Sequence, residues 1–94
     1  MTSGGQPHTE LTIYYFSWVR ESIGKESERV FVPPGVTDIS DLINWLILSG
    51  GATYARAFKN REVVRAAIDR CHVVPATSLR GAKEIAFFPP VTGG

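Results

Sequence analysis

The segment between residues 39 and 47 has the clearest helical pattern in the chain, and it limits the folds that the chain can adopt. Its apolar residues recur at i, i+3, i+4, i+7 and i+8, which predicts a helix with one apolar stripe. They are Ile39, Leu42, Ile43, Leu46 and Ile47. Thr37 or Asp38 can cap the start of this helix, and Gly50 can end it. One such helix can cover only one face of a sheet.

The segments around this helix favour strands. Residues 11–19 are rich in β-branched and aromatic residues and predict a first strand that is largely apolar on both faces. Residues 21–28 are polar with Gly24, which suits a hairpin connection to a short second strand at 29–32. Residues 84–88 predict a last strand, preceded by a turn at 78–83.

The middle of the chain is less clear. Residues 52–58 predict a short helical turn. Residues 61–74 are ambiguous, because their apolar residues fit helical spacing slightly better than the alternation of a hairpin. Periodicity alone therefore favours a helix over 61–74, and a hairpin remains open.

This order of elements is that of an α+β domain of the ubiquitin-like β-grasp type, in which the first and last strands lie side by side in a mixed sheet. The helix leaves one face of the sheet open. We expect Tyr14, Phe16, Trp18 and Phe88 to gather on that face, where exposed aromatic residues indicate a partner surface. The alternative is that residues 51–60 fold over this face and bury some of them.

The chain ends in Pro89-Pro90-Val91-Thr92-Gly93-Gly94. The two prolines remove two amide donors, so the last strand cannot continue past them. Two terminal glycines bring no side chain to a core, but they allow a backbone to enter a narrow channel. We therefore divide the chain into a disordered leader (1–10), a folded domain (11–88) and a flexible projecting tail (89–94) whose Gly94 carboxylate is presented to another protein.

Composition excludes several classes of function. The chain has 94 residues and is 44% hydrophobic, which suits one small domain with a single core. Its net charge of +1 gives no clustered basic face for nucleic acid. A single cysteine excludes an internal disulfide and the usual cysteine-based zinc site. No apolar run is long enough to span a membrane and no signal-peptide pattern opens the chain, so we expect a cytoplasmic protein without membrane contact.

Two stretches carry a resemblance to a known family. The last eleven residues read EIAFFPPVTGG, and residues 15–24 read YFSWVRESIG. A bare terminal Gly-Gly is a weak signal, whereas the whole string FFPPVTGG at the end is a strong one. Over residues 11–94 the chain resembles the small, sulfur-carrying subunit of molybdopterin synthase, the MoaD group of ubiquitin-like β-grasp proteins in the MoaD/ThiS superfamily. This resemblance favours the hairpin over the helix for residues 61–74.

The resemblance implies a function that the composition does not show. An E1-like adenylyltransferase would use ATP to adenylate the Gly94 carboxylate, and a sulfurtransferase would supply the sulfur of a thiocarboxylate. The tail would then enter the large subunit of molybdopterin synthase and donate this sulfur to the dithiolene of molybdopterin. The chain would be a non-catalytic sulfur donor that binds no cofactor and no metal itself.

The resemblance also assigns roles to particular residues. Gly94 would be the reacting residue, and Phe16, His72 and Phe88 would contact the partner. The tail residues lining the partner's channel would be Pro89, Pro90, Val91, Thr92 and Gly93.

The remaining candidate residues have simpler interpretations. Cys71 is expected to be a small, half-buried residue rather than a persulfide relay. His8 and His72 are expected at the surface rather than as metal ligands, because no further ligand stands at metal spacing.

Two other classes of function stay open. One is a protein modifier or a sulfur carrier for another pathway, such as thiamine, thionucleoside or cysteine synthesis. The other is an interaction module that uses its aromatic face and never activates its tail.

Overall fold

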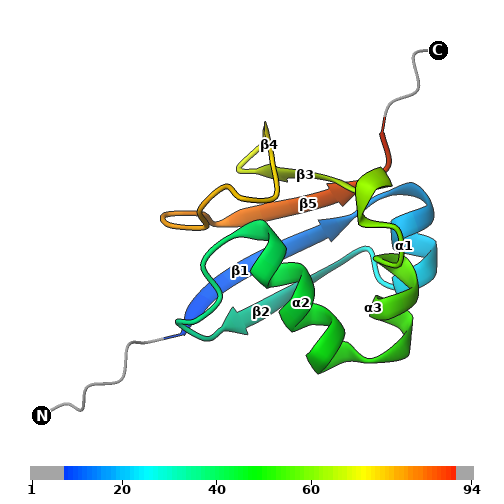
Figure 1. Ribbon diagram of the computed structural model, residues 1–94, viewed down its shortest axis with the longest axis horizontal. Coiled ribbons are helices and arrows are strands. Elements are labelled where there is room, and N and C mark those ends of the chain that lie inside the picture. The colour runs from blue at the N-terminus through cyan, green and yellow to red at the C-terminus, as the bar shows by residue number, and fades with distance from the viewer. Residues whose placement is uncertain (1–7, 91–94) are drawn as a thin grey trace, which may run out of the picture.

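The core of the molecule is a five-stranded mixed sheet with strand order β2-β1-β5-β3-β4. The computed structural model describes residues 8–90, and Figure 1 shows its elements. The strands are β1 (Thr9–Tyr15), β2 (Ser27–Val32), β3 (Arg65–Ile68), β4 (Cys71–Val73) and β5 (Glu84–Phe88). The helices are α1 (Ser17–Ile23), α2 (Ile39–Gly50), α3 (Ala52–Ala57) and the short 3-10 helix η1 (Arg61–Val63).

The first and last strands are parallel neighbours at the centre of the sheet, as predicted. Ile13 pairs with Ile85, and Tyr15 pairs with Phe87. All four side chains are fully buried, because they point toward the helices. This pairing of the two chain ends beneath one main helix is the ubiquitin-like β-grasp arrangement.

The main helix begins and packs as its sequence predicts. The Asp38 side chain accepts a hydrogen bond from the Asp41 backbone N–H at 2.8 Å, which is an N-cap. The Asp41 carboxylate in turn accepts from the backbone N–H and the hydroxyl of Thr37, at 3.0 and 2.9 Å. Leu42 and Leu46 of the predicted stripe are buried against the sheet. The helix includes Gly50 as its last residue, and the residue that caps its end is Gly51, whose φ is 83°.

Gly50 is required because a side chain there would overlap with the ring of Tyr54. Tyr54 is buried, so its ring cannot move aside freely. We expect Gly50→Ala to lower the free energy of unfolding by about 1–3 kcal/mol, the usual cost of overpacking a core. Gly35→Ala is the matched control, since nothing lies near the added methyl group. Equal denaturation midpoints for the two variants would contradict this prediction.

The predicted strand at 11–19 is wrong at both ends. It begins at Thr9, which pairs with Val32, so the expected leader 1–10 is too long. Residues 1–7 lie outside the described residues. The strand ends at Tyr15, and the chain then turns at Ser17, whose φ is 53°.

The predicted hairpin connection at 21–28 is replaced in part by helix α1. Val19 and Ile23, one helical turn apart, are both buried, and α1 packs against α3. Tertiary packing therefore overrides the strand preference of these β-branched residues. Gly24, with φ of 87°, ends the helix, and β2 still pairs antiparallel with β1.

Most of the segment 61–74 forms the hairpin rather than one long helix: the short 3-10 helix η1 comes first, and β3 and β4 follow. Strands β3 and β4 are antiparallel, and β3 also pairs with β5. The turn residues Asp69 and Arg70 both have positive φ, 47° and 74°, as a tight two-residue hairpin requires. The Asp69 carboxylate accepts the backbone N–H groups of Lys83 and Glu84 at 3.1 and 2.8 Å, which ties the turn to the start of β5.

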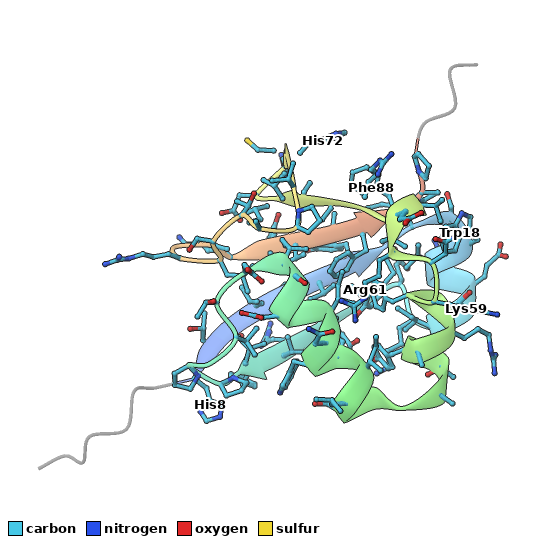
Figure 2. All side chains as sticks on the ribbon, viewed as in Figure 1. His8, Trp18, Lys59, Arg61, His72 and Phe88 are labelled. Atoms are coloured by element: carbon cyan, nitrogen blue, oxygen red, sulfur yellow. The ribbon has the colours of Figure 1, made fainter. Side chains whose placement is uncertain are left out.

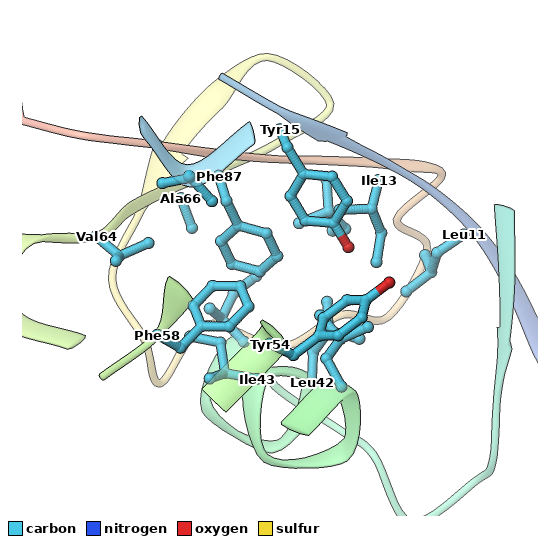
Figure 3. Close-up of a cluster of buried hydrophobic side chains, with 14 of the residues drawn as sticks. Leu11, Ile13, Tyr15, Leu42, Ile43, Tyr54, Phe58, Val64, Ala66 and Phe87 are labelled. Atoms are coloured by element: carbon cyan, nitrogen blue, oxygen red, sulfur yellow. The ribbon is translucent and has the colours of Figure 1, made fainter. Parts of the chain in front are cut away.

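Residues 51–60 do not cover the open face. Helix α3 confirms the predicted helical turn, and it packs against α1 and α2 on the helical side of the sheet. Phe58 packs edge-on against Phe87 with ring centroids 5.0 Å apart, inside the cluster of buried side chains in Figure 3. Within residues 8–90, no helix therefore covers the second face of the sheet. Among the described residues no helix has the length and apolar character needed to cross a membrane.

Candidate functional site: the open face and the base of the tail

The face of the sheet opposite the helices carries a continuous row of side chains across four strands. Tyr14 of β1 pairs with Ala86 of β5, which pairs with Ala67 of β3, which pairs with His72 of β4. These residues alternate with core residues along each strand and so point away from the helices. We call this row, together with Phe16 and Phe88, the open face.

Phe88 packs against a neighbouring ring on this face. Its ring lies against the ring of His72, with centroids 5.0 Å apart and planes tilted by 51°. Figure 2 shows both side chains on the side of the sheet away from α2 and α3. Ala67, although it points away from the core, is only 5% exposed. Phe88 is therefore a partly covered aromatic group, of the kind that often anchors a partner protein.

Phe16 extends this aromatic surface at the end of β1. Its side chain is 48% exposed, and its backbone N–H donates to the Phe87 carbonyl oxygen at 3.1 Å. Next to it lies a shallow depression of about 320 Å³. The depression is lined by Tyr14, Phe16, Arg70, Glu84, Ile85 and Ala86. A hollow of this size beside an exposed aromatic ring can receive a side chain of a partner protein.

The tail leaves the domain beside these aromatic residues. Strand β5 ends at Phe88, as the two prolines predict, and Pro89 and Pro90 follow it outside the sheet, each half-buried. The predicted channel residues Val91, Thr92 and Gly93 and the predicted reacting residue Gly94 lie outside the described residues.

The structure thus brings part of the predicted site together. Phe16, His72 and Phe88 lie on one face, and Pro89 and Pro90 follow directly. The predicted position of Trp18 on the open face is wrong, because this residue lies on helix α1 and not on a strand of that face.

The predicted burial of Cys71 is also wrong. This residue is exposed rather than half-buried, because it lies on the edge strand β4 next to the hairpin turn. His8 and His72 are exposed, as expected. Within residues 8–90, no group of three His, Cys, Asp or Glu side chains is placed to hold a metal ion.

Sequence reasoning missed a polar cluster on the helical side of the sheet. The hydroxyl groups of Tyr15 and Tyr54 both donate to Glu28 Oε2, at 2.7 and 2.6 Å. Lys25 Nζ donates to Glu28 Oε1 at 3.0 Å and to the Tyr54 hydroxyl oxygen at 3.1 Å. The only signal in the sequence is Tyr15 itself, because a tyrosine on a buried face needs a partner for its hydroxyl.

These contacts shift the ionisation of the cluster. Burial raises the pKa of Tyr15, and the hydrogen bond to Glu28 raises it further. Burial also acts to raise the pKa of Glu28, but the hydrogen bonds from Tyr54, Tyr15 and Lys25 outweigh it and hold that pKa below its usual value. The cluster therefore keeps a carboxylate charged at the junction of β1, β2 and α3, where it has a structural role.

Comparison with known proteins now identifies the family. The model of the ThiS family matches residues 13–94, which is most of the chain and includes the tail. The chain belongs to the ThiS family. This confirms the predicted membership of the MoaD/ThiS superfamily. No curated protein matches the chain in sequence.

Solved structures confirm the β-grasp fold of this ThiS-family chain. SAMP1 from Haloferax volcanii is 20% identical, with a TM-score of 0.67 over 92% of this chain and 100% of that one. A putative molybdopterin converting factor, subunit 1, from Pyrococcus furiosus is 21% identical, with a TM-score of 0.65 over 87% of this chain and 98% of that one. The small archaeal modifier protein 1 from Methanosarcina acetivorans is 18% identical, with a TM-score of 0.54 over 93% and 98%.

Proposed function

We propose that this ThiS-family chain is the sulfur-carrying small subunit of a molybdopterin synthase. In this proposal an E1-like adenylyltransferase activates the Gly94 carboxylate, a sulfurtransferase supplies sulfur, and the large synthase subunit accepts it for the dithiolene of molybdopterin. The observation that carries the proposal is the placement of Pro89 and Pro90, which start the tail directly beside Phe88 on an open aromatic face.

The chemistry explains why a terminal carboxylate needs a partner. A carboxylate is a poor electrophile and must be activated before sulfur can attack its carbon. It is activated by attacking the α-phosphorus of ATP, which releases pyrophosphate. The acyl adenylate then has AMP as a good leaving group. Sulfur at the sulfide level, released from the sulfurtransferase by a thiol reductant, displaces AMP at the carbonyl carbon. The thiocarboxylate produced is an anion and a ready nucleophile at neutral pH. In the proposal, ATP and the catalytic groups belong to the partners, and this chain supplies the reacting carbonyl.

Reconstitution with the large synthase subunit tests the choice of pathway. The thiocarboxylated chain, mixed with that subunit and the cyclic pterin phosphate, is expected to form dithiolene. The same chain with an ordinary carboxylate is the matched control and is expected to form none. Absence of dithiolene from the thiocarboxylated chain, with normal complex formation, would contradict the molybdopterin assignment.

A protein modifier is the second candidate, favoured by the structural similarity to two proteins described as SAMP1. A modifier would use the same activated Gly94 but transfer its carbonyl to an amine of another protein. Incubation with the activating enzyme, ATP and a cell extract separates the two functions. Amide-linked conjugates that contain Gly94 would support the modifier, and their absence alongside dithiolene formation would support the sulfur carrier.

The open face gives a prediction about partner binding. Phe88→Asp is expected to weaken binding of the large synthase subunit by about 2 kcal/mol, roughly 30-fold in Kd, because a charge replaces a central aromatic anchor. Titration calorimetry of the complex measures the change.

Phe31→Asp is the matched control for this prediction. Phe31 is 58% exposed and pairs with Glu10, at the end of the sheet away from the tail. We expect the Phe31→Asp variant to bind the large synthase subunit with the affinity of the wild type. If both folded variants bind like the wild type, the open face is not the binding surface.

A further inference from the structure

Basic side chains gather at the end of the molecule from which the tail leaves. The ten-residue stretch 56–65 contains four of them and a single acidic residue, Glu62. The four are Arg56, Lys59, Arg61 and Arg65, and we call them the basic cluster.

The pairing of strands places one member of this cluster, Arg65, at the end of the sheet where the tail begins. Strand β3 is antiparallel to β5, and Arg65 at its start pairs with Phe88 at the end of β5. The connection from α3 through η1, which carries Lys59 and Arg61, leads directly into that position. Figure 2 shows Lys59 and Arg61 in the same half of the molecule as Trp18 and Phe88, where the tail begins.

The positive charges of the cluster are exposed and are not neutralised within residues 8–90. The ion pairs among residues 8–90 are Lys25–Glu28 and Arg29–Glu10. Neither pair includes a member of the basic cluster. Arg61 donates instead to the amide oxygen of Asn44, and Arg65 donates to the Glu62 carbonyl oxygen at 2.9 Å. These neutral acceptors orient two guanidinium groups and leave their charge available.

The opposite end of the sheet has a different charge pattern. There three bases, Arg70, Arg80 and Lys83, accompany two acids, Asp69 and Glu84, so the excess of positive charge is smaller, and the whole chain has a net charge of only +1. The basic cluster is therefore a local feature beside the tail and not a property of the whole surface. It is smaller than the basic faces that bind nucleic acid, which favours a protein partner.

We propose that the basic cluster docks on an acidic surface beside the tail-binding channel of the enzyme that activates Gly94. This inference rests on the proposed activation of the tail. Complementary charges around an interface act mainly on the rate of encounter and on the choice of partner. The cluster would thus bring the tail to its channel in the correct orientation, while the open face supplies the apolar contacts.

The test compares two double charge reversals with the same change in net charge. Lys59→Glu/Arg65→Glu alters the cluster, and Arg80→Glu/Lys83→Glu alters the opposite end. The probe is a purified E1-like adenylyltransferase of the molybdopterin type, and the readout is ATP–pyrophosphate exchange dependent on the carrier chain. At low ionic strength we expect about a tenfold lower kcat/KM for the cluster variant, mostly through KM. The control is expected to stay within about twofold of the wild type.

Salt dependence gives a second readout. The difference between the two variants is expected to shrink at about 1 M salt, where charges are screened over about 3 Å. If the cluster reversal impairs folding, Lys59→Gln/Arg65→Gln replaces it, with an expected loss of about threefold at low salt.

The possible failures are distinguishable. If the wild-type chain is activated and both reversed variants match it, the inference is overturned while the proposed function stands. If the wild-type chain supports no exchange, the proposed activation fails and the inference fails with it. If the cluster variant loses affinity for a mixed-sequence RNA but keeps its rate of activation, the partner is a nucleic acid and the inference is overturned.

Discussion

A chain that carries one alanine after Gly94 is expected to lose ATP-dependent activation, with a fall of at least about 100-fold. The added residue moves the free carboxylate by about 3.3–3.6 Å along an extended tail. A misplacement of even about 1 Å at a reacting centre can cost about 100-fold in rate. The added methyl side chain would also enter a channel that, in the proposed function, accepts only glycine. ATP–pyrophosphate exchange with the E1-like enzyme measures this loss.

The matched control adds the same alanine before Met1. This variant has the same length and composition and keeps Gly94 as the terminal residue, so we expect normal exchange. Normal exchange by the C-terminally extended chain would mean that the Gly94 carboxylate is not the group that is activated.

Glu28→Ala is expected to cause a large loss of stability, about 2–3 kcal/mol in the free energy of unfolding. The substitution leaves the hydroxyl groups of Tyr15 and Tyr54 without their common acceptor, and it removes the carboxylate that Lys25 contacts. Both tyrosines are buried, and leaving a buried donor without its acceptor typically costs about 1–3 kcal/mol. Chemical denaturation measures the change. Glu26→Ala is the control, because this neighbouring residue is exposed, and its effect should stay within about 0.5 kcal/mol.

The same network predicts how stability depends on pH. The pKa of Glu28 is lower in the folded chain than in the unfolded chain, so the carboxylate favours folding. This contribution is fully present above the ordinary carboxyl pKa and disappears as the pH falls through the lowered one. Wild type should therefore lose stability relative to Glu28→Ala on acidification. A constant difference between the two proteins across this range would contradict the role given to Glu28.

Local signals in the sequence predicted a large part of the fold. The stripe from Ile39 to Ile47, the cap at Asp38 and the prolines after Phe88 each act within a few residues, so helix α2 and the end of β5 could be read directly. Helix α1 could not be predicted, because the strand preference of the residues after Tyr15 hides the spacing of Val19 and Ile23.

Contacts between distant residues account for the rest. The turn at Asp69 and Arg70 has positive φ without a glycine, so periodicity alone favoured a helix there, and only the family resemblance indicated the hairpin. The contact between His72 and Phe88 depends on how β4, β3 and β5 align. The carboxylate of Glu28 joins residues from three elements, and no pattern in the sequence shows such a junction.

The most direct measurement of the central claim is the intact mass of the chain after incubation with the E1-like enzyme, ATP and a sulfur donor, followed by fragmentation. We expect a mass increase equal to the exchange of one oxygen for one sulfur, located on the fragment that ends in Gly94, and no such change without ATP. An unchanged mass under conditions in which the same enzyme loads its own carrier would contradict it, and so would sulfur found on Cys71 instead.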